Sequence, residues 1–214
     1  MKSIIIIPTY NEKENIERLI EQITKLNRDF HVLIIDDNSP DGTGRIADGL
    51  AQKHSEVSVI HRSGKLGLGT AYIAGFKYGV ENNYDLVFTM DADFSHQPKY
   101  LIDLLEKAKE YDLVIGSRYI KDGGIKNWPL PRLILSRGAN IYVRMVTGLP
   151  IFDSTGGFNC YRSKVLEKID LDSVISDGYA FQIEIKYNLW EKGFSIKEVP
   201  IIFIDRTRGT SKIS

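Results

Sequence analysis

The chain has 214 residues and a mass of 24.3 kDa, which is long enough for a buried core and excludes a small peptide scaffold. Its 28 basic and 28 acidic residues balance, so no overall positive charge points to nucleic acid as a partner. Cys160 is the only cysteine, which excludes an intramolecular disulfide and a cysteine metal cluster. No stretch approaches the ~18 apolar residues of a membrane span, and the apolar start is too short for a signal peptide. We therefore expect a soluble or membrane-peripheral protein from a reducing compartment.

Strand-length apolar runs alternate with helical patterns in the first half of the chain. The runs lie at residues 3–7, 31–35, 57–60, 86–90 and 113–115. Apolar residues recur at helical spacing between the first two runs, at positions 16, 19, 20 and 23, and between the last two, at positions 101, 104, 105 and 108. Strands that are apolar on both faces and joined by helices indicate a parallel sheet covered on both sides. The sequence therefore predicts an α/β fold with a mostly parallel central sheet.

The second half of the chain has a different pattern. Residues 116–150 form a basic, aromatic-containing connection with a helical pattern near 131–147. Short strands and helices return from Gly156 onward and end with an apolar run at 199–204. The sequence contains no linker, repeat or low-complexity stretch. We therefore expect residues 1–214 to form a single domain whose last third completes a binding edge.

Acidic residues follow two of the predicted strands. Asp91 and Asp93 are two positions apart at a strand end, a spacing that can point both carboxylates at one ligand, and such hard oxygen ligands suit Mg²⁺ or Mn²⁺. Asp36 and Asp37 end another run on the same predicted edge, where parallel sheets bind ligands, and a carboxylate there can accept hydrogen bonds from a base or ribose. Each pair also has a purely structural interpretation, because aspartates cap helices and residues 38–42 carry a strong turn signal.

A glycine-rich loop and several arginines are candidate phosphate sites. The loop at 64–69 lacks the third glycine of a dinucleotide-binding turn and the Gly-Lys-Ser/Thr ending of an ATPase loop, so its glycines better fit a tight turn and close helix packing. Basic side chains are the usual partners of phosphate oxygens, although a solvated surface also accounts for them. They are Arg118, Arg132, Arg137, Arg144 and those within 205–212. The polar turn at 154–158 shows no chemistry, and the chain has no evident Ser/His/Asp triad or paired-histidine metal motif.

The helical pattern near 131–147 has two interpretations. Ile134, Ile141 and Met145 form an apolar stripe flanked by Arg137 and Arg144. Such a helix either lies on a membrane surface or packs on the core with its arginines in water. The pattern alone favours the second interpretation.

Five segments occur in an order that is typical of one enzyme family. They are Pro-Thr-Tyr-Asn-Glu at 8–12, Asp-Asp-Asn-Ser-Pro-Asp-Gly-Thr at 36–43, Gly-Leu-Gly-Thr-Ala-Tyr at 67–72, Asp-Ala-Asp-Phe-Ser-His at 91–96 and Gly-Ser-Arg-Tyr at 116–119. Together they resemble the inverting glycosyltransferases of family 2 and, more narrowly, the polyprenyl (dolichyl) phosphate mannose synthases. Residues 136–140 and the ending at 205–212 strengthen the narrower resemblance. It spans essentially the whole chain and implies a GT-A fold with a Rossmann-like half that binds a nucleotide sugar.

The resemblance also implies roles for particular residues. The donor is usually GDP-mannose, whose guanosine end would contact Pro8, Tyr10, Glu12, Ile35 and Asp37. The diphosphate and a divalent ion, Mg²⁺ or Mn²⁺, would be held by Asp91, Ala92 and Asp93, with Ser95 where relatives often have a further polar residue of the metal shell. The donor phosphates would also be bound by Arg118, Arg206 and Lys212. The acceptor, a polyprenyl (dolichyl) phosphate, would be received by Arg132 and Ser136, and the catalytic residues would be Asp91, Asp93 and Arg118.

The implied reaction fits the residue types that are present. Displacing a nucleoside diphosphate from a sugar carbon requires stabilisation of charge on the leaving phosphates, which a metal ion and cationic side chains supply. A lipid phosphate is already anionic near neutral pH, so it attacks without a general base. Single displacement inverts the anomeric centre, so an α-linked donor gives a β-linked product.

Two other functions stay open on the sequence alone. One is a family 2 enzyme that uses UDP-glucose or another acceptor, and the other is a catalytically silent module that binds a nucleotide sugar or a lipid phosphate. Relatives typically continue beyond the Ser-Lys pair at 211–212 into a further helix, and some carry membrane-spanning segments. We expect a protein that is peripheral at the cytoplasmic face of a membrane, and a missing C-terminal segment or a partner protein would supply any further anchoring.

Overall fold

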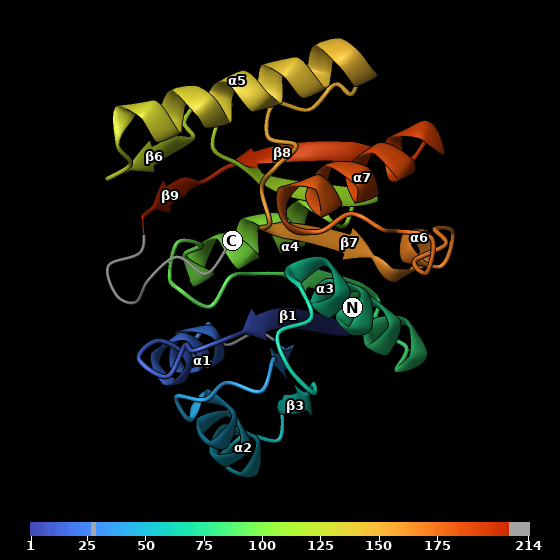
Figure 1. The fold of residues 1–214 in the computed structure, drawn as a ribbon. Coiled ribbons are helices and arrows are strands. Elements are labelled where there is room, and N and C mark those ends of the chain that lie inside the picture. The colour runs from blue at the N-terminus through green and yellow to red at the C-terminus, as the bar shows by residue number, and fades with distance from the viewer. Residues whose placement is uncertain (27–28, 206–214) are drawn as a thin grey trace.

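The computed structural model describes residues 1–26 and 29–205 of the chain. Its centre is a seven-stranded sheet with the order β3-β2-β1-β4-β7-β5-β8, and a smaller sheet pairs β6 with β9 (Figure 1). The strands are β1 Ser3–Thr9, β2 Phe30–Asp36, β3 Val57–His61, β4 Leu86–Thr89, β5 Leu113–Ser117, β6 Gly124–Lys126, β7 Asn159–Arg162, β8 Ile196–Pro200 and β9 Ile202–Ile204. The helices are α1 Ile16–Thr24, α2 Thr43–Lys53, α3 Leu68–Glu81, α4 Leu101–Lys107, α5 Leu130–Thr147, α6 Ser163–Leu166 and α7 Gly178–Glu191, with a 3-10 turn η1 at Pro98–Tyr100.

The predicted mostly parallel sheet is confirmed, with one exception. β1 lies parallel to both β2 and β4, and β5 lies parallel to β8. β7 instead runs antiparallel to both of its neighbours, β4 and β5. The chain leaves β5 at the carboxyl edge of the sheet, forms α5 and re-enters from that same edge, so β7 must run in the opposite direction. The turn before β7 is thereby placed among the carboxyl ends of the parallel strands.

The sheet is buried on both faces, as the apolar strand runs predicted. Ile5 and Ile7 of β1 join the cluster formed with α1, α2 and α4, whereas Ile4 and Ile6 join the cluster formed with α3, α6 and α7. Helix α3 packs closely because Gly75 has no side chain: a Cβ there would lie 2.6 Å from the Ile6 side chain. The two layers fix where each strand ends, and those ends carry the site.

Helix α5 lies beyond the β8 edge of the sheet (Figure 1). The stripe of Ile134, Ile141 and Met145 is 62%, 57% and 80% exposed, so the expectation that it packs on the core is wrong. Neighbouring apolar side chains of the helix are exposed as well, namely Leu130, Leu135, Tyr142 and Val146. Within the described ranges, no helix combines the length and apolarity needed to cross a bilayer.

The apolar run predicted at 199–204 is two strands rather than one. β8 ends at Pro200 in the large sheet, and β9 begins at Ile202 and pairs with β6. This change of sheet carries the chain over the carboxyl edge, where Phe203 and Asp205 line the pocket described below.

Candidate active site

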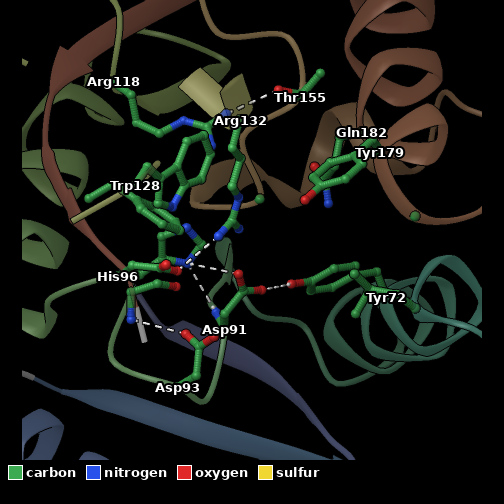
Figure 2. A pocket seen from close by; sticks show the side chains of 16 residues that line it. Tyr72, Asp91, Asp93, His96, Arg118, Trp128, Arg132, Thr155, Tyr179 and Gln182 are labelled. Carbon is green, nitrogen blue, oxygen red and sulfur yellow. Dashed lines mark hydrogen bonds and ion pairs between the residues drawn. The ribbon is translucent and has the colours of Figure 1, made fainter. Parts of the chain in front are cut away.

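Two adjoining hollows lie at the carboxyl edge of the sheet. The outer cleft is lined by Pro8, Thr9, Tyr10, Glu12, Lys65, Gly67, Leu68, Asp91, Ala92 and Asp93. The inner pocket, which Figure 2 shows, is lined by Leu68, Tyr72, Asp91, Asp93, Ser95, His96, Arg118, Trp128, Arg132, Thr155, Gly157, Gly178, Tyr179, Gln182, Phe203 and Asp205. Leu68, Asp91 and Asp93 belong to both. The acidic pair therefore stands where the two hollows meet.

The turn after β4 holds the acidic pair in place. Asp91 accepts a hydrogen bond of 3.2 Å from the Tyr72 hydroxyl, and Asp93 accepts one of 3.0 Å from the backbone N–H of Ser95 (Figure 2). The pKa of Tyr72 is raised well above its usual value, first by burial and then by the charge of Asp91, so its hydroxyl stays a donor.

A buried histidine, His96, also holds this turn. His96 Nδ1 accepts a hydrogen bond of 3.1 Å from the backbone N–H of Asp91, and its ring stacks on Phe158 with 4.9 Å between centroids. Burial lowers the pKa of His96, although nearby Asp91 and Asp93 act in the opposite direction. The neutral ring with an unprotonated Nδ1 matches this contact, so His96 orients the turn that carries Asp91.

The donor set around the acidic pair fits a divalent cation that is shared with a substrate. Among the described residues, the hydroxyl of Ser95 is buried without a hydrogen-bond partner beside Asp91 and Asp93. Over the same residues, no group of three or more His, Cys, Asp or Glu side chains forms a closed metal site. Mg²⁺ and Mn²⁺ accept one or two carboxylates when water and substrate phosphates complete the shell. The predicted ligands Asp91, Asp93 and Ser95 thus lie together.

The outer cleft gathers part of the set predicted for the nucleoside. Pro8, Tyr10 and Glu12 follow one another along its wall. The side chain of Ile35 is instead fully buried in the core, so only its backbone is available to a ligand. Asp37 accepts hydrogen bonds from two nitrogens of the Arg62 guanidinium at 2.5 and 2.6 Å and is not among the residues that line the cleft.

Arg118 presents a fixed positive charge to the inner pocket. Its guanidinium donates to both carboxylate oxygens of Asp153, at 2.7 and 2.6 Å, and to the Thr155 hydroxyl at 3.0 Å. Both members of the ion pair are buried. Burial acts to lower the pKa of Arg118, but the Asp153 carboxylate outweighs it and the pKa rises. The side chain therefore stays cationic and rigid.

The two residues predicted to receive an acceptor lie on successive turns of α5, as their spacing indicated. Arg132 lines the inner pocket, stacks over the Trp128 ring at 4.0 Å and pairs with Asp205 at 3.0 Å (Figure 2). Ser136 accepts a hydrogen bond of 2.7 Å from the Tyr119 hydroxyl and is not among the residues that line the pocket. Arg206 and Lys212 lie outside the described residues, so their roles stay predictions.

Comparison with known proteins decides the family. Residues 4–170 match the model of glycosyl transferase family 2. The chain belongs to this family. It is 47% identical, over 100% of its length and 81% of the relative's, to a polyprenol monophosphomannose synthase from Mycolicibacterium smegmatis. It is 45% identical to an undecaprenyl-phosphate mannosyltransferase from Micrococcus luteus, over 100% of its own length and 88% of the relative's.

Solved structures of other glycosyltransferases share the fold. One is glucosyl-3-phosphoglycerate synthase from Mycobacterium tuberculosis in complex with Mn²⁺, UDP and glucosyl-3-phosphoglycerate. It superposes with a TM-score of 0.71 over 98% of this chain and 72% of that chain, at 18% identity. The same enzyme was also solved with Mg²⁺ and UDP, with a TM-score of 0.70. The predicted GT-A type of α/β fold is therefore confirmed.

Several residues of this glycosyltransferase's site were missed at the sequence level. Lys65 lines the outer cleft 5.6 Å from the Tyr10 ring, although its loop matches no phosphate-binding motif. Thr155 and Gly157 belong to the polar turn that showed no chemistry, yet both line the inner pocket. For Lys65 the sequence did hold a signal, namely a lysine among glycines in the loop after a strand. For Gln182 on α7 no local signal exists, because only packing brings it to the pocket.

Proposed function

We propose that this glycosyltransferase moves mannose from GDP-mannose to a polyprenyl phosphate with inversion at the anomeric carbon. The observation that carries the proposal is that Asp91 and Asp93 line both the outer cleft and the inner pocket, which also contains Arg118 and Arg132. A nucleotide in the outer cleft would place its diphosphate and sugar beside this pair, facing Arg118 and Arg132. The names of the two bacterial relatives support the sugar and the acceptor.

The donor would be held by residues of the outer cleft. Pro8, Tyr10 and Glu12 would contact the guanosine, and Lys65, which lies near the Tyr10 ring, would add a positive charge to the same cleft. Asp91 and Asp93, with Ser95, would hold Mg²⁺ or Mn²⁺, and that ion would neutralise charge on the leaving diphosphate. The Mn²⁺ and Mg²⁺ complexes of the structural neighbour support a divalent ion in this fold.

The acceptor would enter through the inner pocket. Arg118 and Arg132 both line this pocket, so Arg132 would orient the acceptor phosphate while Arg118 would bind the donor phosphates beside it. The attacking phosphate oxygen is already anionic, so the site needs no side chain to remove a proton. Rigid placement of Arg118 by Asp153 lets its charge stabilise phosphate without reorganisation.

A lipid acceptor also requires a surface against the membrane, and we propose that α5 supplies it. The helix contains three arginines and no acidic residue, and its exposed apolar side chains form one face next to the pocket residue Arg132. Within the described chain, Arg137 and Arg144 form no ion pair and instead lie over Tyr119 and Phe152. An anionic bilayer complements this combination, whereas a second copy would bring like charges together. Residues 1–214 would then act as one catalytic domain, peripheral at the cytoplasmic face.

The decisive experiment supplies purified protein with labelled GDP-mannose, Mg²⁺ and undecaprenyl phosphate, followed by organic extraction. We expect lipid-linked mannose that a β-mannosidase releases. Parallel reactions contain UDP-glucose in place of the donor, or phosphoglycerate in place of the lipid. Faster transfer from UDP-glucose would overturn the donor assignment, and product on phosphoglycerate alone would overturn the acceptor. Tight binding of GDP-mannose without any transfer would favour the silent binding module.

A further inference from the structure

The turn at residues 153–157 connects both halves of the active site. At one end Asp153 holds the Arg118 guanidinium and its backbone N–H. At the other end Gly157 accepts a hydrogen bond of 2.7 Å from Thr89, and a Cβ built on Gly157 would lie 3.7 Å from a carboxylate oxygen of Asp91. A shift of this turn would therefore move the groups beside the acidic pair and the arginine together.

Side chains from three separate elements hold this turn. Asn140 of α5 accepts hydrogen bonds from both the N–H and the hydroxyl of Ser154, at 2.7 and 2.8 Å. Glu198 of β8 accepts one of 2.9 Å from the N–H of Asp153. The third is Lys186 of α7, which is fully buried under the turn.

The ammonium group of Lys186 fits the backbone of the turn. Its Nζ lies 2.5 Å from the carbonyl oxygen of Gly156, 3.0 Å from that of Ser154 and 3.4 Å from that of Asp153. An ammonium has three N–H donors for these three acceptors, whereas a neutral amine has two. Over the described residues, Lys186 forms no ion pair within 4.0 Å. Its ammonium group therefore interacts with the backbone carbonyl oxygens of this turn.

A buried lysine without a close carboxylate is costly to keep. Burial lowers its pKa to about 7, against the opposing charge of Asp153. An apolar side chain would fill the same space without that penalty. Unfavourable groups that persist near an active site are often functional, because activity and stability make opposite demands there.

We propose that Lys186 is a positioning residue, which fixes the 153–157 turn and thereby, through Asp153, the Arg118 guanidinium in the geometry needed for transfer. The inference rests on the proposed function, because it assigns Arg118 a role in turnover. Lys186 contacts the backbone of the turn and is not among the residues that line either hollow.

A double-mutant cycle tests this dependence. We expect Lys186→Met to stay folded and to lower kcat by roughly 10- to 100-fold, because small misplacements of catalytic groups have effects of that size. In an Arg118→Ala background the same change should cost less than about 2-fold, since groups that act as one unit are not additive. Lys192→Met, at an exposed lysine just after the same helix, is the matched control and should change neither kcat nor thermal stability.

The outcomes separate this inference from the proposed function. Additive losses in the double variant, or normal turnover of Lys186→Met while Arg118→Ala is impaired, would overturn the role of Lys186 alone. Full turnover of Arg118→Ala would remove the proposed role of Arg118 and this inference with it. If the loss in Lys186→Met follows a matching loss of folded protein, the lysine is structural and the inference is wrong.

The unmodified enzyme gives a second readout. The charged groups that face the Lys186 ammonium are Asp153, Arg118 and Glu198. We expect kcat to fall as the pH rises above about 7, because the neutral amine loses one donor to the turn. Ionisation of an acceptor phosphate would raise the rate over the same range, so the two effects differ in sign. The absence of an alkaline fall in the wild type, or its persistence in Lys186→Met, would overturn the proposal.

Discussion

Carboxylate side chains at the edge of the sheet differ in their hydrogen-bond and ion-pair partners. Asp36 accepts hydrogen bonds from Ser39. Asp37 forms an ion pair with Arg62, and Asp153 forms one with Arg118. Asp91 keeps a side chain that is 37% exposed at the junction of the two hollows. In the sequence Asp36, Asp37 and Asp91 look alike because each lies at or just after a strand end, so their different roles come from their partners. Asp91 and its neighbour Asp93 are therefore the pair to test for metal-dependent turnover.

Replacement of Asp93 by asparagine should abolish most turnover while leaving the fold intact. The change keeps the shape of the side chain and removes one negative charge from the proposed metal site. Loss of charge stabilisation in a transition state commonly costs roughly 10²-fold or more in rate. Initial rates across a Mg²⁺ titration, with calorimetric GDP binding with and without Mg²⁺, measure the effect. Asp103→Asn, exposed on α4 and outside both hollows, is the control. Near-normal rates in a folded Asp93→Asn enzyme would remove the metal assignment.

Arg132→Ala should weaken use of polyprenyl phosphate and leave GDP affinity nearly unchanged. Charge-assisted hydrogen bonds contribute about 1.5–3 kcal/mol, so we expect the acceptor KM to rise roughly 10-fold or more. Lysine at this position should rescue only partly, because it keeps the charge and loses both the fork and the flat stacking surface over Trp128. Acceptor saturation curves together with GDP titrations measure both effects. Arg45→Ala, exposed on α2, is the matched control. A parallel loss of GDP affinity would place Arg132 in the donor site instead.

At the scale of elements, α5 is the helix whose sequence pattern was ambiguous. The same apolar stripe suits a helix packed on a core and a helix lying on a membrane, because both bury one face. The difference lies in what the fold places opposite that face. No segment within residues 1–26 and 29–205 covers the stripe, and Asn140 is the residue of the helix that is buried. A membrane surface is the partner that its composition fits.

A double variant of α5, Ile134→Glu with Met145→Glu, should reduce binding to vesicles. Each side chain would bury apolar area worth about 1.5–3 kcal/mol, so the pair should weaken binding roughly 10²-fold. Flotation with phosphatidylglycerol vesicles and with phosphatidylcholine vesicles measures binding, and the anionic vesicles should bind the wild type better because of Arg137 and Arg144.

The control for the vesicle experiment is Lys53→Glu on α2, which lies at the opposite end of the molecule from α5 (Figure 1). It introduces the same charged side chain away from the proposed face and should leave vesicle binding unchanged. Equal loss of binding in this variant would contradict a specific face. A dimer in solution that only the α5 changes dissociate would show that a second copy covers the helix.

At the scale of the whole molecule, the buried pair of Arg118 and Asp153 links stability to pH. Burial acts to raise the pKa of Asp153, but the charge and hydrogen bonds of Arg118 outweigh it and hold the pKa below its usual 3.8. A carboxyl group whose pKa is lower in the folded state adds stability that is present above the unfolded pKa and is lost as pH falls through the folded value. The fold should therefore lose stability below about pH 4.

Urea unfolding from pH 7 down to about pH 2 checks this linkage. Asp153→Asn should lower the free energy of unfolding at pH 7 by about 3 kcal/mol or more, because it leaves a buried arginine unpaired. The variant should also show a smaller further loss in acid. Asp41 and Asp112 remain in both proteins and contribute to the residual slope. Burial acts to raise the pKa of each, but hydrogen bonds from Thr43 outweigh it at Asp41 and those from Lys164 and Ser195 outweigh it at Asp112, so both pKa values are lowered. An unchanged slope in the variant would show that Asp153 is not the linked group.

Much of the architecture could be predicted because it depends on local pattern. Each of the five predicted strand runs is a strand of the large sheet, and the first helical pattern buries Ile16, Leu19, Ile20 and Ile23 on one face of α1. Runs that are apolar on both sides fold only if both sides are covered, so such runs specify a two-layered sheet by themselves. The carboxyl edge, and with it the position of Asp91 and Asp93, follows from the same rule.

The sequence by itself therefore determined the α/β framework, the acidic edge and the order of motifs that marks the glycosyltransferase family. The tertiary structure decided which partner each charged side chain has. Asp205 pairs with Arg132, 73 residues away in the sequence, and Lys186 binds the 153–157 turn, about 30 residues away. It also decided that β7 runs antiparallel and that, within the described part of the chain, the apolar face of α5 is exposed. The physical reason is range: periodicity reports whether a residue is buried, whereas its partner depends on how distant segments pack.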